Sequence, residues 1–243
     1  MDIKTRSRAA RSAFCSYGAR SDGGELRRNQ GAGPSRRALI AAAAAFITLS
    51  RRAAADAPLR LVALGDSLTA GPGLSSQESF PQVLQRQLAG KGLSVAIANA
   101  GVSGDTAEDG LQRLDWSVPK ETQGVILELG ANDALRGLDP KRCEATLDEI
   151  VAKLQGRGTA VLLCGMYAPR NLGADYVGAF DGIYPRLSAK YGLTLYPFFL
   201  DGVTGHPKLT LPDGLHPNAE GVKVIVDKIL PTVETFIGKL AAR

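Results

Sequence analysis

The sequence predicts an α/β fold in which a five-stranded parallel sheet is covered by helices on both faces. From residue 59 onward, apolar runs of strand length alternate with longer segments whose apolar residues have helical spacing. Strands separated by helices in this way pair in parallel, because each helix carries the chain back across the sheet. No internal repeat or linker interrupts the pattern, so we expect one domain over residues 58–243.

Five segments have the length and apolar content of buried strands. The first covers residues 59–64 and leads directly into Gly65, Asp66, Ser67 and Leu68. The other four expected strands are residues 94–98, 124–129, 159–164 and 193–198. Since the carboxyl ends of parallel strands meet at one edge of a sheet, we expect the loops that follow these segments to lie together.

The intervening segments have apolar residues at helical spacing. The expected helices are residues 80–88, 106–114, 140–154, 176–191 and 222–237. Thr106 is a suitable N-cap for the second of them, with acidic residues in the following turn. Pro231 is expected to kink or split the last one.

The basic charge of the chain is concentrated in its first 58 residues. These carry eleven Lys or Arg and four Asp or Glu, whereas the remainder carries eighteen basic and twenty acidic residues. The predicted domain is therefore mildly acidic. The overall pI of about 9.2 gives no argument for nucleic-acid binding.

Residues 1–57 have the features of an export leader, with a periplasmic or secreted location for the domain that follows. Arg36 and Arg37 precede an apolar run over residues 38–49, and an A-x-A-like sequence places a cleavage site after Ala55 or Ala57. The run is shorter than the roughly 20 residues of a membrane span. The arginine pair indicates the twin-arginine route. Residues 1–34 exceed an ordinary n-region, and the alternative is an unprocessed cytoplasmic tail.

Cysteine and glycine patterns give no sign of a metal or nucleotide site. No CxxC or histidine cluster has metal-ligand spacing, so we expect neither metal nor cofactor. The loop after the first strand lacks both GxGxxG and GxxxxGK[ST], which argues against a nucleotide. Whether Cys143 and Cys164 form a disulfide stays open at this level.

Candidate residues for acyl transfer occur in the loops after the predicted strands. Ser67 follows the first strand, although a serine there is more often a turn or cap residue. His216 would serve as its base at neutral pH, and Asp213, three residues earlier, would orient the imidazole. The backbone N–H groups of Ser67 and Gly104 and the side-chain amide of Asn132 are candidate donors to the oxyanion of the tetrahedral intermediate.

Four blocks in this order make the chain resemble the SGNH hydrolases, also called GDSL esterases or lipases. The blocks are Gly65-Asp66-Ser67-Leu68, Gly104, Gly130-Ala131-Asn132-Asp133 and Asp213-Gly214-Leu215-His216-Pro217. The flanking residues 103–106, 128–137 and 196–199 are similar to the periplasmic thioesterase, lysophospholipase and arylesterase branch. The resemblance covers about 185 residues. It implies a flavodoxin-like three-layer α/β/α sandwich and hydrolysis of carboxylic esters or acyl thioesters. Ser67, Asp213 and His216 would form the catalytic triad, and Ser67, Gly104 and Asn132 the oxyanion hole.

The substrate is expected to be a small ester or lipid-like molecule. Apolar residues near the predicted loops are candidates to bind it: Leu74, Phe80, Val102, Leu135, Tyr167, Pro169, Leu172 and Phe199. Arg136 would either meet an anionic head group or be a surface charge. Three alternatives remain: a carbohydrate O-deacetylase, a non-catalytic binding protein on the same fold, and an enzyme that transfers acyl groups to alcohols.

Overall fold

The computed structural model describes residues 57–242, and its centre is a five-stranded sheet. The strands are β1 (Leu59–Gly65), β2 (Val95–Gly101), β3 (Gly124–Glu128), β4 (Ala160–Cys164) and β5 (Thr194–Tyr196). Their order in the sheet is β2-β1-β3-β4-β5, and every pair is parallel. The predicted five-stranded parallel sheet is confirmed.

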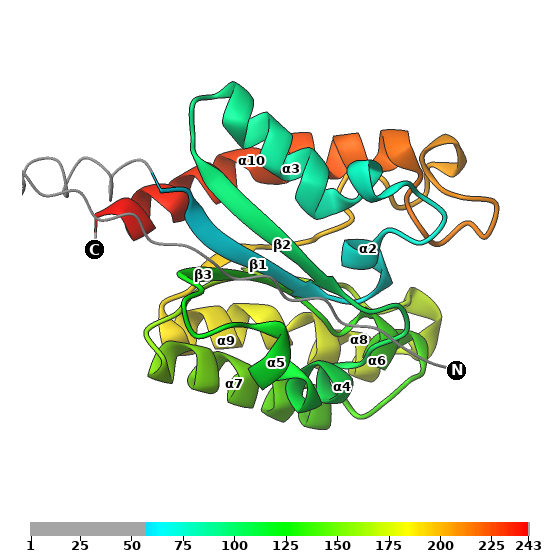
Figure 1. The fold of residues 1–243 in the computed structure, drawn as a ribbon. Coiled ribbons are helices and arrows are strands. Elements are labelled where there is room, and N and C mark those ends of the chain that lie inside the picture. Colours follow the sequence, from blue (N-terminus) through cyan, green and yellow to red (C-terminus); the bar gives the residue numbers. More distant parts are fainter. Residues whose placement is uncertain (1–56, 243) are drawn as a thin grey trace, which may run out of the picture. The chain divides into compact units, whose positions relative to one another are not determined.

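Helices cover both faces of this sheet, so the α/β/α layering is also confirmed (Figure 1). One face carries α3 (Phe80–Gly90) and α10 (Ala219–Ala241). The other face carries α4 (Ala107–Gln112), α5 (Leu114–Ser117), α7 (Pro140–Gly156), α8 (Ala174–Asp181) and α9 (Ile183–Tyr191). Two short helices, α2 (Ser67–Ala70) and α6 (Ala131–Leu135), directly follow β1 and β3.

The core lies between the sheet and the two helical layers. Every residue of β3 and β4 is buried, as expected for central strands covered on both faces. Long α10 contributes a stripe of buried side chains at helical spacing: Val222, Ile225, Val226, Ile229, Val233 and Phe236. Burial of one such large apolar side chain stabilises the fold by about 1.5–3 kcal/mol.

Two expected helices are each divided in the structure. The segment predicted as residues 176–191 forms α8 and α9, which meet at Gly182. Pro185 explains this break, because it has no N–H to donate to the Asp181 carbonyl and its ring would clash with that carbonyl. The segment predicted as one helix over residues 106–114 forms α4 and the start of α5. Arg113, with φ −99° and ψ 4°, separates the two helices.

The expected split at Pro231 is wrong. Helix α10 continues through this residue from Ala219 to Ala241, and begins three residues before the predicted start. Pro231 lies on the exposed side of the helix. Because proline has no N–H, the Asp227 carbonyl receives no helical hydrogen bond from Pro231. Water reaches this exposed side of the helix and can hydrate the carbonyl instead.

Cys143 on α7 and Cys164 at the end of β4 are both free and buried. Within residues 57–242, no helix is long and apolar enough to cross a membrane. The expected export leader, including residues 38–49 and the cleavage sequence up to Asp56, lies outside the described residues.

Gly101 brings α2 close to the end of β2 where the site begins. Gly65 and Gly101 are register partners at the ends of β1 and β2. A Cβ on Gly101 would overlap the Ala70 backbone in α2 and approach the Asp66 carbonyl to 2.8 Å. Only glycine permits this approach, so α2 packs directly on the end of β2.

Candidate active site

Ser67 is the first residue of α2, immediately after β1. Asp66 caps this short helix, and its Oδ1 accepts the Leu68 N–H at 2.9 Å. Gly71 ends the helix in the left-handed region with φ 77°, and its N–H donates to the Ser67 carbonyl at 2.9 Å. The sharp turn between strand and helix holds the 8% exposed Ser67 at the carboxyl edge of the sheet.

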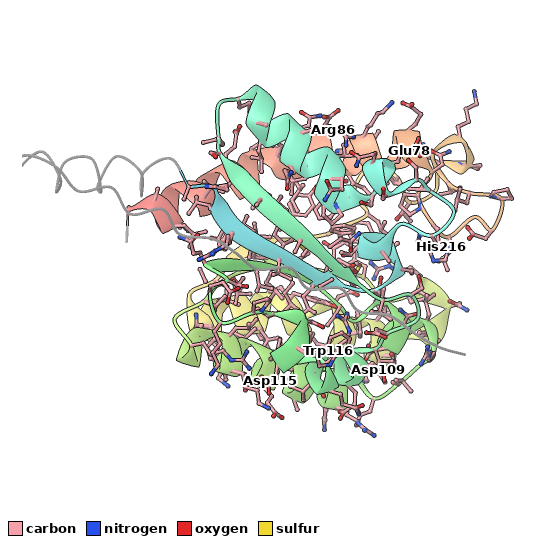
Figure 2. The ribbon with its side chains drawn as sticks, in the orientation of Figure 1. Glu78, Arg86, Asp109, Asp115, Trp116 and His216 are labelled. Carbon is pink, nitrogen blue, oxygen red and sulfur yellow. The ribbon has the colours of Figure 1, made fainter. Side chains whose placement is uncertain are left out.

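His216 reaches Ser67 from a loop 149 residues further along the chain. Its Nε2 lies 2.9 Å from Ser67 Oγ, and its Nδ1 lies 2.7 Å from Asp213 Oδ2. Figure 2 shows His216 on a loop at the end of the sheet where α2 lies in Figure 1. The three predicted residues therefore form one continuous hydrogen-bonded chain.

The loop that carries Asp213 and His216 is tightly turned. Asp213 Oδ1 accepts the backbone N–H groups of Leu215 at 2.8 Å and His216 at 3.0 Å. The bond from the His216 ring, followed by these two backbone bonds, lowers the pKa of Asp213 to about 2. Asp213 is therefore ionised at neutral pH and is a strong acceptor for the imidazole N–H.

Asn132 and Gly104 lie beside Ser67, Asn132 at the start of α6 and Gly104 on the loop after β2. Gly130, with φ 112°, turns the chain from β3 into α6 and places Asn132 in the first turn of that helix. Asn132 Nδ2 donates to Asp66 Oδ2 at 3.1 Å and to the Asp105 carbonyl at 2.9 Å. Gly104 has φ 90°, and its carbonyl accepts Arg136 Nη2 at 2.7 Å. Arg136 therefore holds this loop, a contact that no local sequence pattern predicts.

Two carboxyl groups are buried behind Ser67. Glu128 is fully buried at the end of β3, where its Oε2 accepts Thr69 Oγ1 at 2.7 Å and the Asp66 N–H at 3.3 Å. Burial, followed by the nearby Asp66 charge, holds the pKa of Glu128 well above its usual range. Burial likewise raises the pKa of Asp66 to about 6, against the lowering effect of the Leu68 N–H. Burial therefore favours the neutral form of Glu128 over the ionised form.

A largely apolar cavity of about 730 Å³ opens beside Ser67 and His216. Three of the predicted substrate-binding residues line it: Leu135, Tyr167 and Pro169. Further lining residues that were not predicted are Pro72, Ser103, Ala131, Ala134, Met166, Ala168, Arg170, Phe198, Leu200, Thr204 and Leu215. Most of them lie just after a strand or beside a predicted site residue. This position in the sequence is the signal from which they could have been predicted.

The other predicted substrate-binding residues lie outside the cavity wall: Leu74, Phe80, Val102, Leu172 and Phe199. Phe199 is fully buried and packs edge-on against Phe80, with ring centroids 4.9 Å apart. Its neighbour Phe198 instead stacks on Tyr167 at the cavity, with centroids 4.5 Å apart. Leu74 packs against the core, Val102 is exposed, and Leu172 is half-buried in a short 3-10 helix.

A serine hydroxyl bonded to an imidazole that is held by a carboxylate is the side-chain arrangement of serine hydrolases. The chain belongs to the GDSL-like Lipase/Acylhydrolase family, which it matches over residues 63–224. This is the SGNH-hydrolase fold, confirming the resemblance read from the four sequence blocks.

Three relatives and one solved structure define the class further. Esterase TesA of Pseudomonas aeruginosa is 34% identical over 82% of this chain and 98% of its own. The arylesterase of Vibrio mimicus is 38% identical over 72% and 87% of the two chains. Thioesterase 1/protease 1/lysophospholipase L1 of Escherichia coli K12 is 37% identical over 77% and 88%. The crystal structure of AlinE4, an SGNH-hydrolase family esterase, is 45% identical over 73% and 96%, with a TM-score of 0.62. This chain is a carboxylic ester hydrolase.

Proposed function

We propose that the chain hydrolyses carboxylic esters of aryl or acyl type, including lysophospholipids and acyl thioesters, through an acyl-enzyme on Ser67. The observation that carries the proposal is the unbroken chain from Ser67 Oγ to His216 and Asp213, at 2.9 and 2.7 Å, beside an apolar cavity. These distances are within the range needed for proton transfer from a serine nucleophile to its base.

In the first half-reaction, Ser67 Oγ attacks the carbonyl carbon while its proton passes to His216 Nε2. Asp213 keeps the other ring nitrogen protonated and stabilises the imidazolium that forms. The imidazolium then protonates the leaving alcohol or thiol, which departs from the acyl-enzyme. Water repeats the sequence in the second half-reaction and releases the carboxylic acid with Ser67 restored.

The negative oxygen of each tetrahedral intermediate would be bound by the N–H groups of Ser67 and Gly104 and the amide of Asn132. The Ser67 N–H lies in the first turn of α2, where a helix offers no internal acceptor. The side-chain amide of Asn132 donates to Asp66 Oδ2 and to the Asp105 carbonyl in this structure. The oxyanion would therefore share an amide hydrogen with one of these two acceptors. Each such donor contributes about 10²–10³-fold to the rate.

The cavity supports an apolar acyl or aryl group as the bound portion of the substrate. Leu135, Met166, Tyr167, Phe198 and Leu200 line it, and only a few polar groups interrupt these side chains. A carbohydrate acetate would offer hydroxyl groups that such a wall cannot pair. The lining therefore favours the esterase proposal over an O-deacetylase.

The test is hydrolysis of p-nitrophenyl esters from acetate to palmitate by the purified full chain and by Ser67→Ala. The variant should lose about 10⁶-fold in kcat with its fold intact by circular dichroism. Ser94→Ala, an exposed serine before β2 at the far end of the sheet, is the matched control and should retain full activity. Equal rates in the wild type and Ser67→Ala would refute the proposal.

A covalent probe gives an independent readout. A p-nitrophenyl alkylphosphonate should form a Ser67 Oγ–phosphorus bond with release of p-nitrophenolate, detected as added mass on the peptide that contains Ser67. Label on any other residue would contradict the proposal.

Residues 1–57 are proposed to direct export of the domain that begins at residue 58. The support is the arginine pair at 36 and 37, the apolar run at 38–49 and the A-x-A-like sequence. The N-terminal sequence of the protein recovered from separated cell fractions tests this. An intact residue 1 in the cytoplasmic fraction alone would reject it.

A further inference from the structure

Arg113 is a buried arginine outside the proposed triad and oxyanion hole. It lies between α4 and α5 and is 6% exposed. Its backbone leaves helical geometry at this residue, which ends α4 and begins α5. A buried guanidinium is costly unless its N–H groups are paired, so its partners identify what it is placed to do.

The guanidinium joins the ends of the first two strands. Nη2 donates to the Gly65 carbonyl at 2.8 Å, two residues before Ser67. Nη1 donates to the Ala100 carbonyl at 2.8 Å and to Ser117 Oγ at 3.1 Å. One planar group thereby fixes the end of β1, which carries the nucleophile turn, against the end of β2.

The same group also holds the loop that contains Gly104. Nε donates to Asp105 Oδ2 at 2.6 Å in an ion pair whose side chains are 8% and 13% exposed. The backbone carbonyl of Asp105 in turn accepts Asn132 Nδ2 at 2.9 Å. Asp105 therefore follows one proposed oxyanion donor in sequence and directly contacts another.

We propose that Arg113 is a positioning residue that sets Ser67, Gly104 and Asn132 at the separations needed to bind the oxyanion. This inference rests on the proposed function of those three residues. A lysine cannot replace the arginine, because a single ammonium on a flexible stem lacks the planar fork that spans both carbonyls and the carboxylate. Displacement of catalytic groups by about 1 Å lowers the rate by about 10²-fold.

The test compares Arg113→Lys with the double variant Arg113→Met/Asp105→Asn. The double variant removes both members of the buried ion pair, so it leaves no unpaired charge in the interior and should fold even if Arg113→Met alone does not. Both variants should lose about 10²-fold in kcat on p-nitrophenyl butyrate with KM within about threefold of wild type. The rate of phosphonylation of Ser67, which also develops charge on oxygen, should fall in parallel.

Two controls distinguish a loss of positioning from a general loss of stability and from failure of the proposed function. Ile237→Ala, at the far end of α10, should lower Tm with kcat unchanged at 25 °C. If either Arg113 variant keeps kcat within twofold of wild type while its Tm falls, the positioning role is overturned. Failure of the proposed function has a different signature, because Ser67→Ala would then remain active.

Discussion

The side-chain amide of Asn132 donates to Oδ2 of Asp66 at 3.1 Å, although 66 residues separate the two in sequence. This bond ties the turn after β3 to the residue that caps the helix of Ser67. The proposed oxyanion donor is therefore oriented by the same residue that shapes the nucleophile turn.

Asn132→Ala should lower kcat by about 10²–10³-fold on p-nitrophenyl esters, with a small change in KM, because the lost bond is strongest when the oxygen is charged. Steady-state kinetics over the ester series measure this. Asn171→Ala, an exposed asparagine outside the cavity wall, is the control. A rise in KM with unchanged kcat would show that Asn132 binds the substrate and the transition state equally and has no special role with the oxyanion.

Asp213→Asn should lower kcat by about 10⁴-fold, since an amide cannot hold the imidazole as the carboxylate does. Because hydrogen bonds lower the pKa of Asp213 to about 2, it stays ionised down to about pH 3 and should not cause an acidic limb in kcat above that pH. A pH–rate profile from pH 4 to 9 tests both statements. Asp227→Asn on the exposed side of α10 is the control, and equal losses in the two variants would refute the role of Asp213.

Glu128→Gln should become progressively more stable than the wild type as pH rises. Burial raises the pKa of Glu128 well above its unfolded value of 4.5, so the wild type loses stability as pH rises from about 4.5 to the folded-state pKa, by at most about 1.4 kcal/mol per pH unit. Glutamine retains the oxygen that accepts Thr69 Oγ1 and the Asp66 N–H, but it does not titrate.

Urea unfolding at pH 5, 6, 7 and 8 measures this difference in the free energy of unfolding. Glu121→Gln, at an exposed glutamate before β3, is the control variant. A difference that stays constant with pH for Glu128→Gln would mean that Glu128 is ionised in the folded protein.

Tyr167→Ala should weaken the preference for longer acyl or aryl groups. The tyrosine ring stacks on Phe198 at the cavity, and the Arg170 guanidinium lies 5.4 Å from its centroid. Each methylene that the wild-type cavity buries should raise kcat/KM by up to about fourfold, corresponding to about 0.8 kcal/mol. The slope of kcat/KM against chain length should therefore be lower in the variant.

Trp116→Ala provides the matched control for this prediction. Trp116 is 75% exposed on α5 and lies outside the cavity wall, so its loss should leave the chain-length profile unchanged. An unchanged profile in Tyr167→Ala would mean that the apolar part of the substrate binds away from this aromatic pair.

The sequence by itself determined the five strands, the parallel sheet and the edge at which the site residues would meet. These features depend on local patterns, because the spacing of apolar residues and the residue types in the loops specify each element. The loops that follow parallel strands then lie at the same edge of the sheet. Ser67, Gly104, Asn132, Asp213 and His216 lie together for this reason. The split that Pro231 allowed did not occur, because the exposure of the helix to water at this residue permits the chain to continue as a helix.

Only the tertiary structure decided which neighbours face the cavity and which charges are buried. Phe198 and Phe199 are chemically identical and adjacent, yet one stacks at the cavity and the other packs in the core. Arg113 resembles a surface charge until its bonds to residues 13 and 48 positions earlier are known. The raised pKa of Glu128 likewise results from desolvation by distant segments. Desolvation and long-range hydrogen bonding depend on distances in space, which no local pattern encodes.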